Sequence, residues 1–249
     1  MSTAHAPAAF VRVTTQDGVS TITWSRPERR NAIGAQVSDE LTSALGSVAQ
    51  RDDVHVVVLS GQEPPFCAGW DVTDFRALDG AEPQQLHDFF GHGRALLAAV
   101  SDAPALVVAA VRGTALGFGC ALLSRCDVVI AAEDAVFGLP EVGLGMPPAT
   151  ALPELLSVMR PRTALHWAAT GERFDAQRAR LDGLVTDVVP AADLDRAVST
   201  LASRLAAHPD SATRLTKRLV AQMSGLPLDR RVAVGVESAV GRFAQQVKA

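Results

Sequence analysis

The 249-residue sequence contains no tyrosine, two lysines and three cysteines. The cysteines lack the spacing of a metal site, and three of them cannot form a disulfide framework, so we expect a reducing compartment and no bound metal. The net charge of −4 predicts no basic surface for nucleic acid. No apolar run reaches the ~18 residues of a membrane span, and the N-terminus lacks the basic flank of a signal peptide. We therefore expect a cytoplasmic protein without membrane or nucleic-acid partners, with a disordered tail over residues 1–9.

Hydrophobic residues make up 48% of the chain, which is ample for the core of one large domain. Two alternating segments, 10–14 and 19–24, flank Asp17-Gly18 and predict a β-hairpin. Continuous apolar runs at 54–59 and 105–111 predict strands buried on both faces. Strands that alternate with helices are typical of an α/β fold with a largely parallel sheet covered on its faces.

The remaining elements are predicted from periodicity and from glycine and proline breaks. Helices are expected over 38–50, 84–100, 149–159, 162–170 and 175–181, and a strand over 184–189. Residues 72–83 are expected to form a mobile loop with one helical turn at 72–78. The chain from Asp193 onward is helical, with breaks at His208-Pro209 and Gly225-Leu226-Pro227.

The segment 111–148 organises the rest of the chain. It predicts a strand, a turn with Gly117, a short helix, a buried strand, and a loop that carries one acidic residue, Glu141. A helix that begins inside a glycine turn presents unpaired N–H groups, which suit an anion or an oxyanion. The same pattern also fits an ordinary strand–turn–helix crossover without a site.

Four segments carry a family pattern, and they follow one another in order within residues 10–190. They are RPERRNA at 26–32, FCAGWD at 66–71, VRGTALGFGC at 111–120 with Cys126-Asp127, and FGLPE at 137–141 with Gly143, Gly145 and Pro147. Together they resemble the crotonase family, also called the enoyl-CoA hydratase/isomerase superfamily.

The resemblance implies a spiral of repeated ββα units over 10–190 and a C-terminal helical oligomerisation region over 191–249. It implies a homotrimer or a dimer of trimers, an acyl-CoA thioester as substrate, and no separate cofactor. Glu141 would act as acid and base, and the backbone N–H groups of Ala68 and Phe118 would stabilise the thioester enolate. Phe118 stands where the family usually has glycine, and its ring could instead fill the core.

Ala121 is the main departure from the family pattern, because hydratases usually have a second glutamate there. A single carboxylate suits the transfer of a proton from one carbon to another, which favours an enoyl-CoA isomerase over a hydratase. Some members of the family hydrate with one carboxylate, so both reactions stay open. The same fold would also suit a catalytically silent acyl-CoA-binding protein, or a thioester hydrolase or C–C lyase.

Contacts to coenzyme A are expected from arginines near the nucleotide and from the backbone of Ala68 to Val72. The arginines are Arg26, Arg29 and Arg30, which suit phosphate unless they only form a solvated loop. Asp71 matches an acidic position of the family or caps the turn after it. Trp70 is interpreted first as a packing residue and second as a ligand contact, and Asp127 as a structural residue.

Overall fold

The computed structural model describes residues 9–246, so the tail predicted over 1–9 lies outside the described residues apart from Ala9. The strands are β1 (Val11–Gln16), β2 (Val19–Trp24), β3 (Val56–Gly61), β4 (Leu106–Val111), β5 (Thr114–Leu116), β6 (Val128–Ala132), β7 (Val136–Gly138), β8 (Arg173–Asp175) and β9 (Asp187–Val189). The α-helices are α1 (Ala35–Ala49), α2 (Val72–Arg76), α3 (Pro83–Asp102), α4 (Phe118–Ser124), α5 (Leu152–Leu155), α6 (Pro161–Thr170), α7 (Ala176–Asp182), α8 (Leu194–Ala206), α9 (Asp210–Met223) and α10 (Leu228–Gln246). Three short 3-10 helices are η1 (Pro27–Arg29), η2 (Pro140–Leu144) and η3 (Ala191–Asp193).

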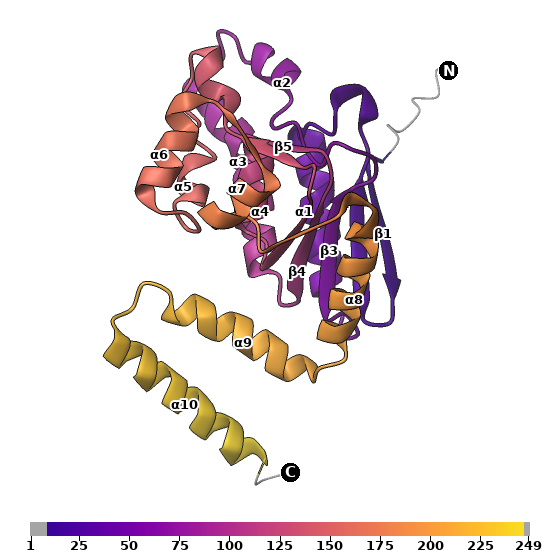
Figure 1. The fold of residues 1–249 in the computed structure, drawn as a ribbon, viewed down its shortest axis with the longest axis vertical. Helices are drawn as coiled ribbons and strands as arrows, with labels where there is room; N and C mark the ends of the chain where they lie inside the picture. Colours follow the sequence, from indigo (N-terminus) through magenta and orange to yellow (C-terminus); the bar gives the residue numbers. More distant parts are fainter. Residues whose placement is uncertain (1–8, 247–249) are drawn as a thin grey trace.

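Two sheets organise the body of the molecule (Figure 1). The larger sheet has the strand order β1-β2-β3-β4-β6-β9 and is parallel except for the β1–β2 hairpin. The smaller sheet has the order β5-β7-β8. A strand of the larger sheet is followed by one of the smaller sheet and then by a helix, as in β4-β5-α4 and β6-β7-η2-α5. This repetition confirms the predicted spiral of ββα units.

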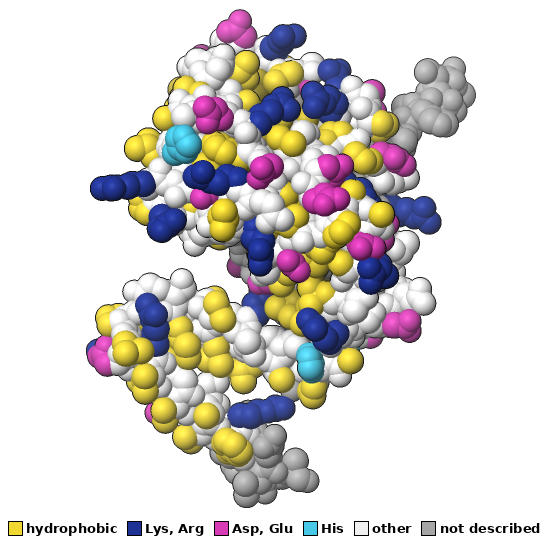
Figure 2. Space-filling view, viewed as in Figure 1, with side chains coloured by type: hydrophobic (Ala, Val, Ile, Leu, Met, Phe, Trp, Pro, Cys, Tyr) yellow, Lys and Arg dark blue, Asp and Glu magenta, His cyan; other side chains and the backbone are white. Residues whose placement is uncertain are grey.

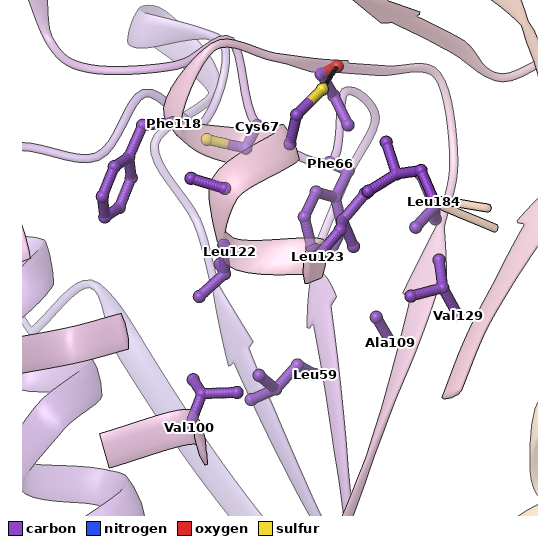
Figure 3. Close-up of a cluster of buried hydrophobic side chains, with 14 of the residues drawn as sticks. Leu59, Phe66, Cys67, Val100, Ala109, Phe118, Leu122, Leu123, Val129 and Leu184 are labelled. Carbon is purple, nitrogen blue, oxygen red and sulfur yellow. Dashed lines mark hydrogen bonds between the residues drawn. The ribbon is translucent and has the colours of Figure 1, made fainter. Parts of the chain in front are cut away.

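Alternate residues of the buried strands enter two separate cores, as a strand period of two requires. Val57 and Leu59 of β3 face the larger core, whereas Val56 and Val58 face a smaller core beneath α8. Figure 3 shows the larger core at α4, where Leu122 and Leu123 meet side chains from the strands that surround them. In α8, Leu194, Val198 and Ala202 repeat every four residues, so one face of the helix covers the sheet.

Helices α9 and α10 form a hairpin that projects from the body at the end opposite to α2 (Figure 1). Lys217 fixes α9 to the body, because its Nζ donates to Asp127 Oδ2 (2.7 Å) and to the carbonyl of Ala105 (3.1 Å). Asp127 Oδ2 also accepts from the N–H of Val107 (2.7 Å), which confirms the structural role predicted for this residue. The helical structure predicted after Asp193 is confirmed for the described part of this region.

The short elements depart most from the predictions. The helix expected over 149–159 is reduced to α5, four residues within a series of turns, because the N–H groups of Ser157 and Val158 donate to carbonyls three residues back instead of four. The strand predicted over 105–111 is confirmed as β4, and the strand predicted at the start of 111–148 is β5, which begins after Gly113 and joins the other sheet. The single turn at 72–78 is confirmed as α2, and the long helix after it as α3.

Candidate active site

The turn between β5 and α4 leaves a backbone donor unused. Gly117 has φ +52°, a left-handed conformation that L-residues adopt at a cost, and its N–H donates to the carbonyl of Gly138 (2.9 Å). The next N–H, that of Phe118, begins α4 and has no acceptor among residues 9–246. The carbonyl of Gly117 accepts from Cys120 and Ala121, so the turn is held from both sides. The Phe118 N–H is therefore fixed in position and available to a ligand.

The segment from Phe66 to Asp71 runs beside this turn. The N–H of Cys67 donates to Thr114 (3.0 Å), and the carbonyl of Cys67 accepts from Leu116 (3.0 Å). A Cβ added to Gly69 would lie 3.2 Å from the carbonyl oxygen of Leu116 and 3.9 Å from the nitrogen of Phe118. The backbone of Gly69 thus comes close to the free N–H of Phe118.

The N–H of Ala68 is not available to a ligand. It donates to the carbonyl of Arg30 (3.2 Å), so its predicted role as an oxyanion donor is wrong. Sequence reasoning missed this because the direction of each N–H depends on which chain segment lies beside it. Cys67 pairs with the smaller sheet, so the N–H of the next residue points to the other side.

Trp70 offers a different donor. Ile33 and Trp70 form a parallel bridge, in which Ile33 donates to Gly69 (2.9 Å) and accepts from Asp71 (3.0 Å). In such a bridge the N–H of the central residue, Trp70, points away from Ile33. That N–H has no acceptor within the described part of the chain. The segment therefore presents the N–H of Trp70, two residues beyond the predicted donor.

Glu141 lies against the same turn. Its Oε1 is 2.6 Å from the point that a Cβ on Gly117 would occupy, so a side chain at this position would displace the carboxyl group. Its Oε2 is buried and has no hydrogen-bond partner among the described residues. Burial raises the pKa of Glu141 above its ordinary value. A carboxyl group in this state, beside unused N–H donors, has the properties of a general acid and base.

The position at which hydratases of the family have a second glutamate holds no carboxylate. Ala121 is fully buried in α4, and its methyl group can neither accept nor donate a proton. The nearby thiols do not replace it, because burial raises the pKa of Cys67 and Cys120 to about 12 and keeps both protonated. No group of three or more histidine, cysteine or acidic side chains in residues 9–246 is placed to hold a metal ion.

Arg26 is engaged inside the protein, which contradicts its predicted role at a phosphate. Its Nη2 lies 3.0 Å from Asp71 Oδ2, and the two side chains are 15% and 4% exposed. Its Nη1 donates to the carbonyl of Ala32 (3.1 Å), and its guanidinium lies over the ring of Phe10. Arg29 and Arg30 are exposed, and Arg29 donates to Thr73 Oγ1 (3.0 Å).

Asp71 forms the N-cap of α2, where its Oδ1 accepts from the N–H of Thr73 (2.9 Å). Burial alone would raise the pKa of Asp71, but hydrogen bonds from Thr73 and the pairing with Arg26 outweigh it and hold this pKa below its usual range. The capping interpretation of Asp71 is thereby confirmed. Val72, the first residue of α2, is exposed.

No helix in the described part of the chain is both long and apolar enough to cross a membrane. The model of the family described as enoyl-CoA hydratase/isomerase matches residues 14–246. A probable enoyl-CoA hydratase of Mycobacterium tuberculosis is 37% identical over 206 residues, which cover 81% of this chain and 77% of the relative. The 2,3-dehydroadipyl-CoA hydratase of Escherichia coli is 34% identical over 222 residues, which cover 89% and 85%.

Solved structures show the same similarity. A crystal structure of an enoyl-CoA hydratase from Mycobacterium smegmatis has a TM-score of 0.88 at 28% identity and covers 94% of this chain and 91% of its own. The human enoyl-CoA hydratase domain-containing protein 3 has a TM-score of 0.87 at 26% identity, with 94% and 92% covered. The family model, the solved structures and the order of the motifs agree. The chain therefore belongs to the enoyl-CoA hydratase/isomerase (crotonase) family and is an acyl-CoA enzyme of that type.

Proposed function

We propose that this enzyme isomerises enoyl-CoA thioesters with Glu141 as its single acid and base. The observation that carries the proposal is the buried carboxyl group of Glu141 against Gly117, beside the free N–H of Phe118, with Ala121 in the place of a second carboxylate. One carboxyl group can receive a proton and return it elsewhere, whereas the addition of water also requires a group that positions the water.

The N–H groups of Phe118 and Trp70 act together in this proposal. They donate to the thioester oxygen, where negative charge develops as a proton leaves C2. Both are fixed by neighbouring backbone bonds, so no reorganisation is needed when the charge forms. The second donor is assigned to Trp70 instead of Ala68, because the N–H of Ala68 already donates to the carbonyl of Arg30.

The proposed reaction has two proton transfers. The carboxylate of Glu141 takes a proton from C2 of a 3-enoyl thioester, and the C2–H electrons move into a dienolate that the two N–H groups stabilise. The protonated Glu141 then donates to C4, and the double bond lies between C2 and C3. The carboxylate is regenerated, and no water is consumed.

Hydration is the second candidate, because relatives in Mycobacterium tuberculosis and Escherichia coli carry the name hydratase. In that reaction, Glu141 would activate the water that adds at C3 and return a proton to C2. A silent acyl-CoA-binding protein and a thioester hydrolase or C–C lyase are outcomes of the same test.

Mass spectrometry of enoyl-CoA thioesters incubated with the enzyme in D₂O tests the proposal. Uptake of deuterium together with a shifted double bond and no gain of water is the expected result. Added water would establish a hydratase, and free coenzyme A would establish a hydrolase. Binding without any chemical change would leave a carrier protein and overturn the proposal.

The exposed Arg29 and Arg30 and the backbone between Ala68 and Val72 form the proposed coenzyme A site. Two features support it: both arginines are accessible, and both lie on the loop that contacts this backbone through the carbonyl of Arg30. Arginine binds phosphate oxygens through paired donors. No cofactor besides the substrate is included in the proposal, and a cytoplasmic location stays a prediction.

A homotrimer or a dimer of trimers is the proposed assembly. Helix α10 supports it with exposed apolar residues about one turn apart, and Figure 2 shows hydrophobic side chains along the hairpin. These residues are Leu228, Val232, Val236, Val240 and Phe243. An apolar stripe of this kind is stabilised by another protein surface. Light scattering after size-exclusion chromatography should give three or six subunits, and Val236→Glu should lower that number; a wild-type monomer would contradict the assembly.

A further inference from the structure

The two residues that carry the proposed oxyanion donors also carry large aromatic rings. The rings of Trp70 and Phe118 lie in contact, with centroids 4.5 Å apart and planes tilted by 35°. The Phe118 side chain is 1% exposed, and Figure 3 shows its ring on the side of α4 away from Leu123 and Leu184. The reactive end of a thioester bound to the two N–H groups would therefore meet a pair of rings.

Helix α3 packs against the rings of Trp70 and Phe118. A Cβ on Gly93 would lie 2.4 Å from Cζ2 of Trp70 and 3.0 Å from Cε2 of Phe118, so the helix touches both rings through a residue without a side chain. Phe89 of the same helix lies 5.2 Å from Trp70, measured between ring centroids. The indole Nε1 of Trp70 has no hydrogen-bond partner among the described residues, so ring packing positions this side chain.

A groove of about 750 Å³ that is open to solvent lies beside α3. Trp70 and Phe118 line it together with apolar residues such as Leu97 and Pro153 and with polar residues of α3 such as His87, Asp88 and Arg94. Glu141 is not among its lining residues. Trp70 and Phe118, which carry the proposed oxyanion donors, thus line this groove, whereas the acid/base group does not.

We propose that Trp70 and Phe118 form a wall that restricts the enzyme to short acyl-CoA thioesters. This inference rests on the proposed function of the site. Protein interiors are close-packed, so a long chain cannot pass between rings in contact without moving them. Where an apolar pocket is open, each additional methylene group improves kcat/KM by roughly fourfold. The two rings remove this gain in kcat/KM for acyl chains too long to fit between the reaction centre and the rings.

The test compares 3-hexenoyl-CoA with 3-dodecenoyl-CoA in the wild type and in Phe118→Ala. The wild type should prefer the shorter substrate, and the variant should raise the ratio of dodecenoyl to hexenoyl kcat/KM by at least about tenfold. Phe89→Ala, which loosens the support of Trp70, should raise the same ratio less, and it keeps the test valid if Phe118→Ala does not fold. A wild type that prefers the dodecenoyl substrate would overturn the wall.

The matched control is Phe90→Ala. Phe90 also lines the groove, but its ring contacts are with Phe75 and Phe89. Since chains do not reach the groove in the wild type, removal of this ring should leave the chain-length ratio unchanged. A rise equal to that of Phe118→Ala would show that the rings of Trp70 and Phe118 are not the barrier.

Binding of saturated thioesters separates failure of the wall from failure of the proposed reaction. Titration calorimetry should show that hexanoyl-CoA binds the wild type more tightly than dodecanoyl-CoA, and that Phe118→Ala reverses this order. If no thioester is turned over but this order holds, the reaction is wrong and the wall stands. If turnover occurs and dodecanoyl-CoA binds the wild type as tightly as hexanoyl-CoA, the wall is wrong and the reaction stands.

Discussion

The loop at Arg26–Asn31 and the turn at Gly117–Phe118 use their polar groups in opposite ways. In the loop, the buried Asn31 side chain accepts from the N–H of Arg26 (2.7 Å) and donates to the carbonyls of Glu63 and Pro65 (both 2.7 Å). At the turn, the N–H of Phe118 has no acceptor in the described structure. Both belong to family motifs, but the loop uses its Asn31 side chain within the fold, whereas the turn leaves a backbone N–H for a substrate.

This difference separates residues that hold the frame from residues that meet the ligand. Buried polar groups without partners are costly, and proteins retain few of them. The turn at Gly117 has two such features close together, the Phe118 N–H and Glu141 Oε2. The loop at Arg26 instead joins β2, the segment after β3, and α2 through Asn31 and Asp71. Motif membership alone does not distinguish the two roles.

The largest effect is expected from Glu141→Gln. An amide of the same shape cannot take a proton, so kcat should fall by about a thousandfold while the Kd for saturated acyl-CoA changes little. Steady-state kinetics and calorimetry measure the two quantities. Glu133→Gln is the control, because Glu133 is exposed, and it should retain wild-type kcat. Normal turnover in Glu141→Gln would remove this residue from the mechanism.

Gly117→Ala tests the turn itself. The added Cβ would enter the space of Glu141 Oε1, and φ +52° is strained for alanine, so we expect a loss of about 1–2 kcal/mol in the free energy of unfolding. Displacement of the carboxyl group should lower kcat/KM by about a hundredfold. Urea unfolding and kinetics check both. Gly143→Ala meets no atom within 4 Å and should change neither; equal behaviour of the two variants would contradict the geometry.

Arg26→Met and Arg30→Met compare the frame with the proposed ligand site. Loss of Arg26 leaves the buried Asp71 unpaired, so the free energy of unfolding should fall by about 3 kcal/mol. Arg30 is exposed, so its loss should leave stability unchanged and raise KM several-fold if it binds phosphate. Chemical denaturation and kinetics distinguish the two. Unchanged stability in Arg26→Met, with a raised KM, would restore the phosphate role predicted from sequence.

The smallest expected effect is on the pH dependence of stability. Burial raises the pKa of Glu141, so the folded chain holds this proton at pH values where the unfolded chain has lost it. Its contribution to stability is therefore fully present below the ordinary glutamate pKa and falls as pH rises toward the raised value. Glu141→Gln should remove this slope in denaturation experiments across that window. Activity should rise over the same window, because the base must be ionised.

Local pattern was sufficient for the regular elements. Asp17-Gly18 between alternating segments indicated the β1–β2 hairpin, the apolar run at 54–59 overlaps β3, and the run at 105–111 contains β4. That β4 and β5 join different sheets could not be predicted, because strand partners come from distant parts of the chain.

Some residues of the site were predicted correctly from sequence, and others were assigned the wrong role. Glu141 in η2 and Phe118 at the start of α4 were identified because each lies in a family motif, and the structure brings them together at the Gly117 turn. Ala68 and Arg26 were misassigned because their partners, the Arg30 carbonyl and Asp71, come from other segments of the fold. The ring contact of Trp70 with Phe118 likewise joins residues 48 positions apart, and no local pattern indicates it.

The most direct test of the central claim is deuterium exchange at C2 of hexanoyl-CoA, followed by NMR in D₂O. This saturated thioester cannot be isomerised or hydrated, so exchange reports only removal of the C2 proton by the base and stabilisation of the enolate. The account predicts that the wild type and Glu133→Gln catalyse the exchange and that Glu141→Gln does not. Exchange in Glu141→Gln at the wild-type rate, or none in the wild type, would contradict it.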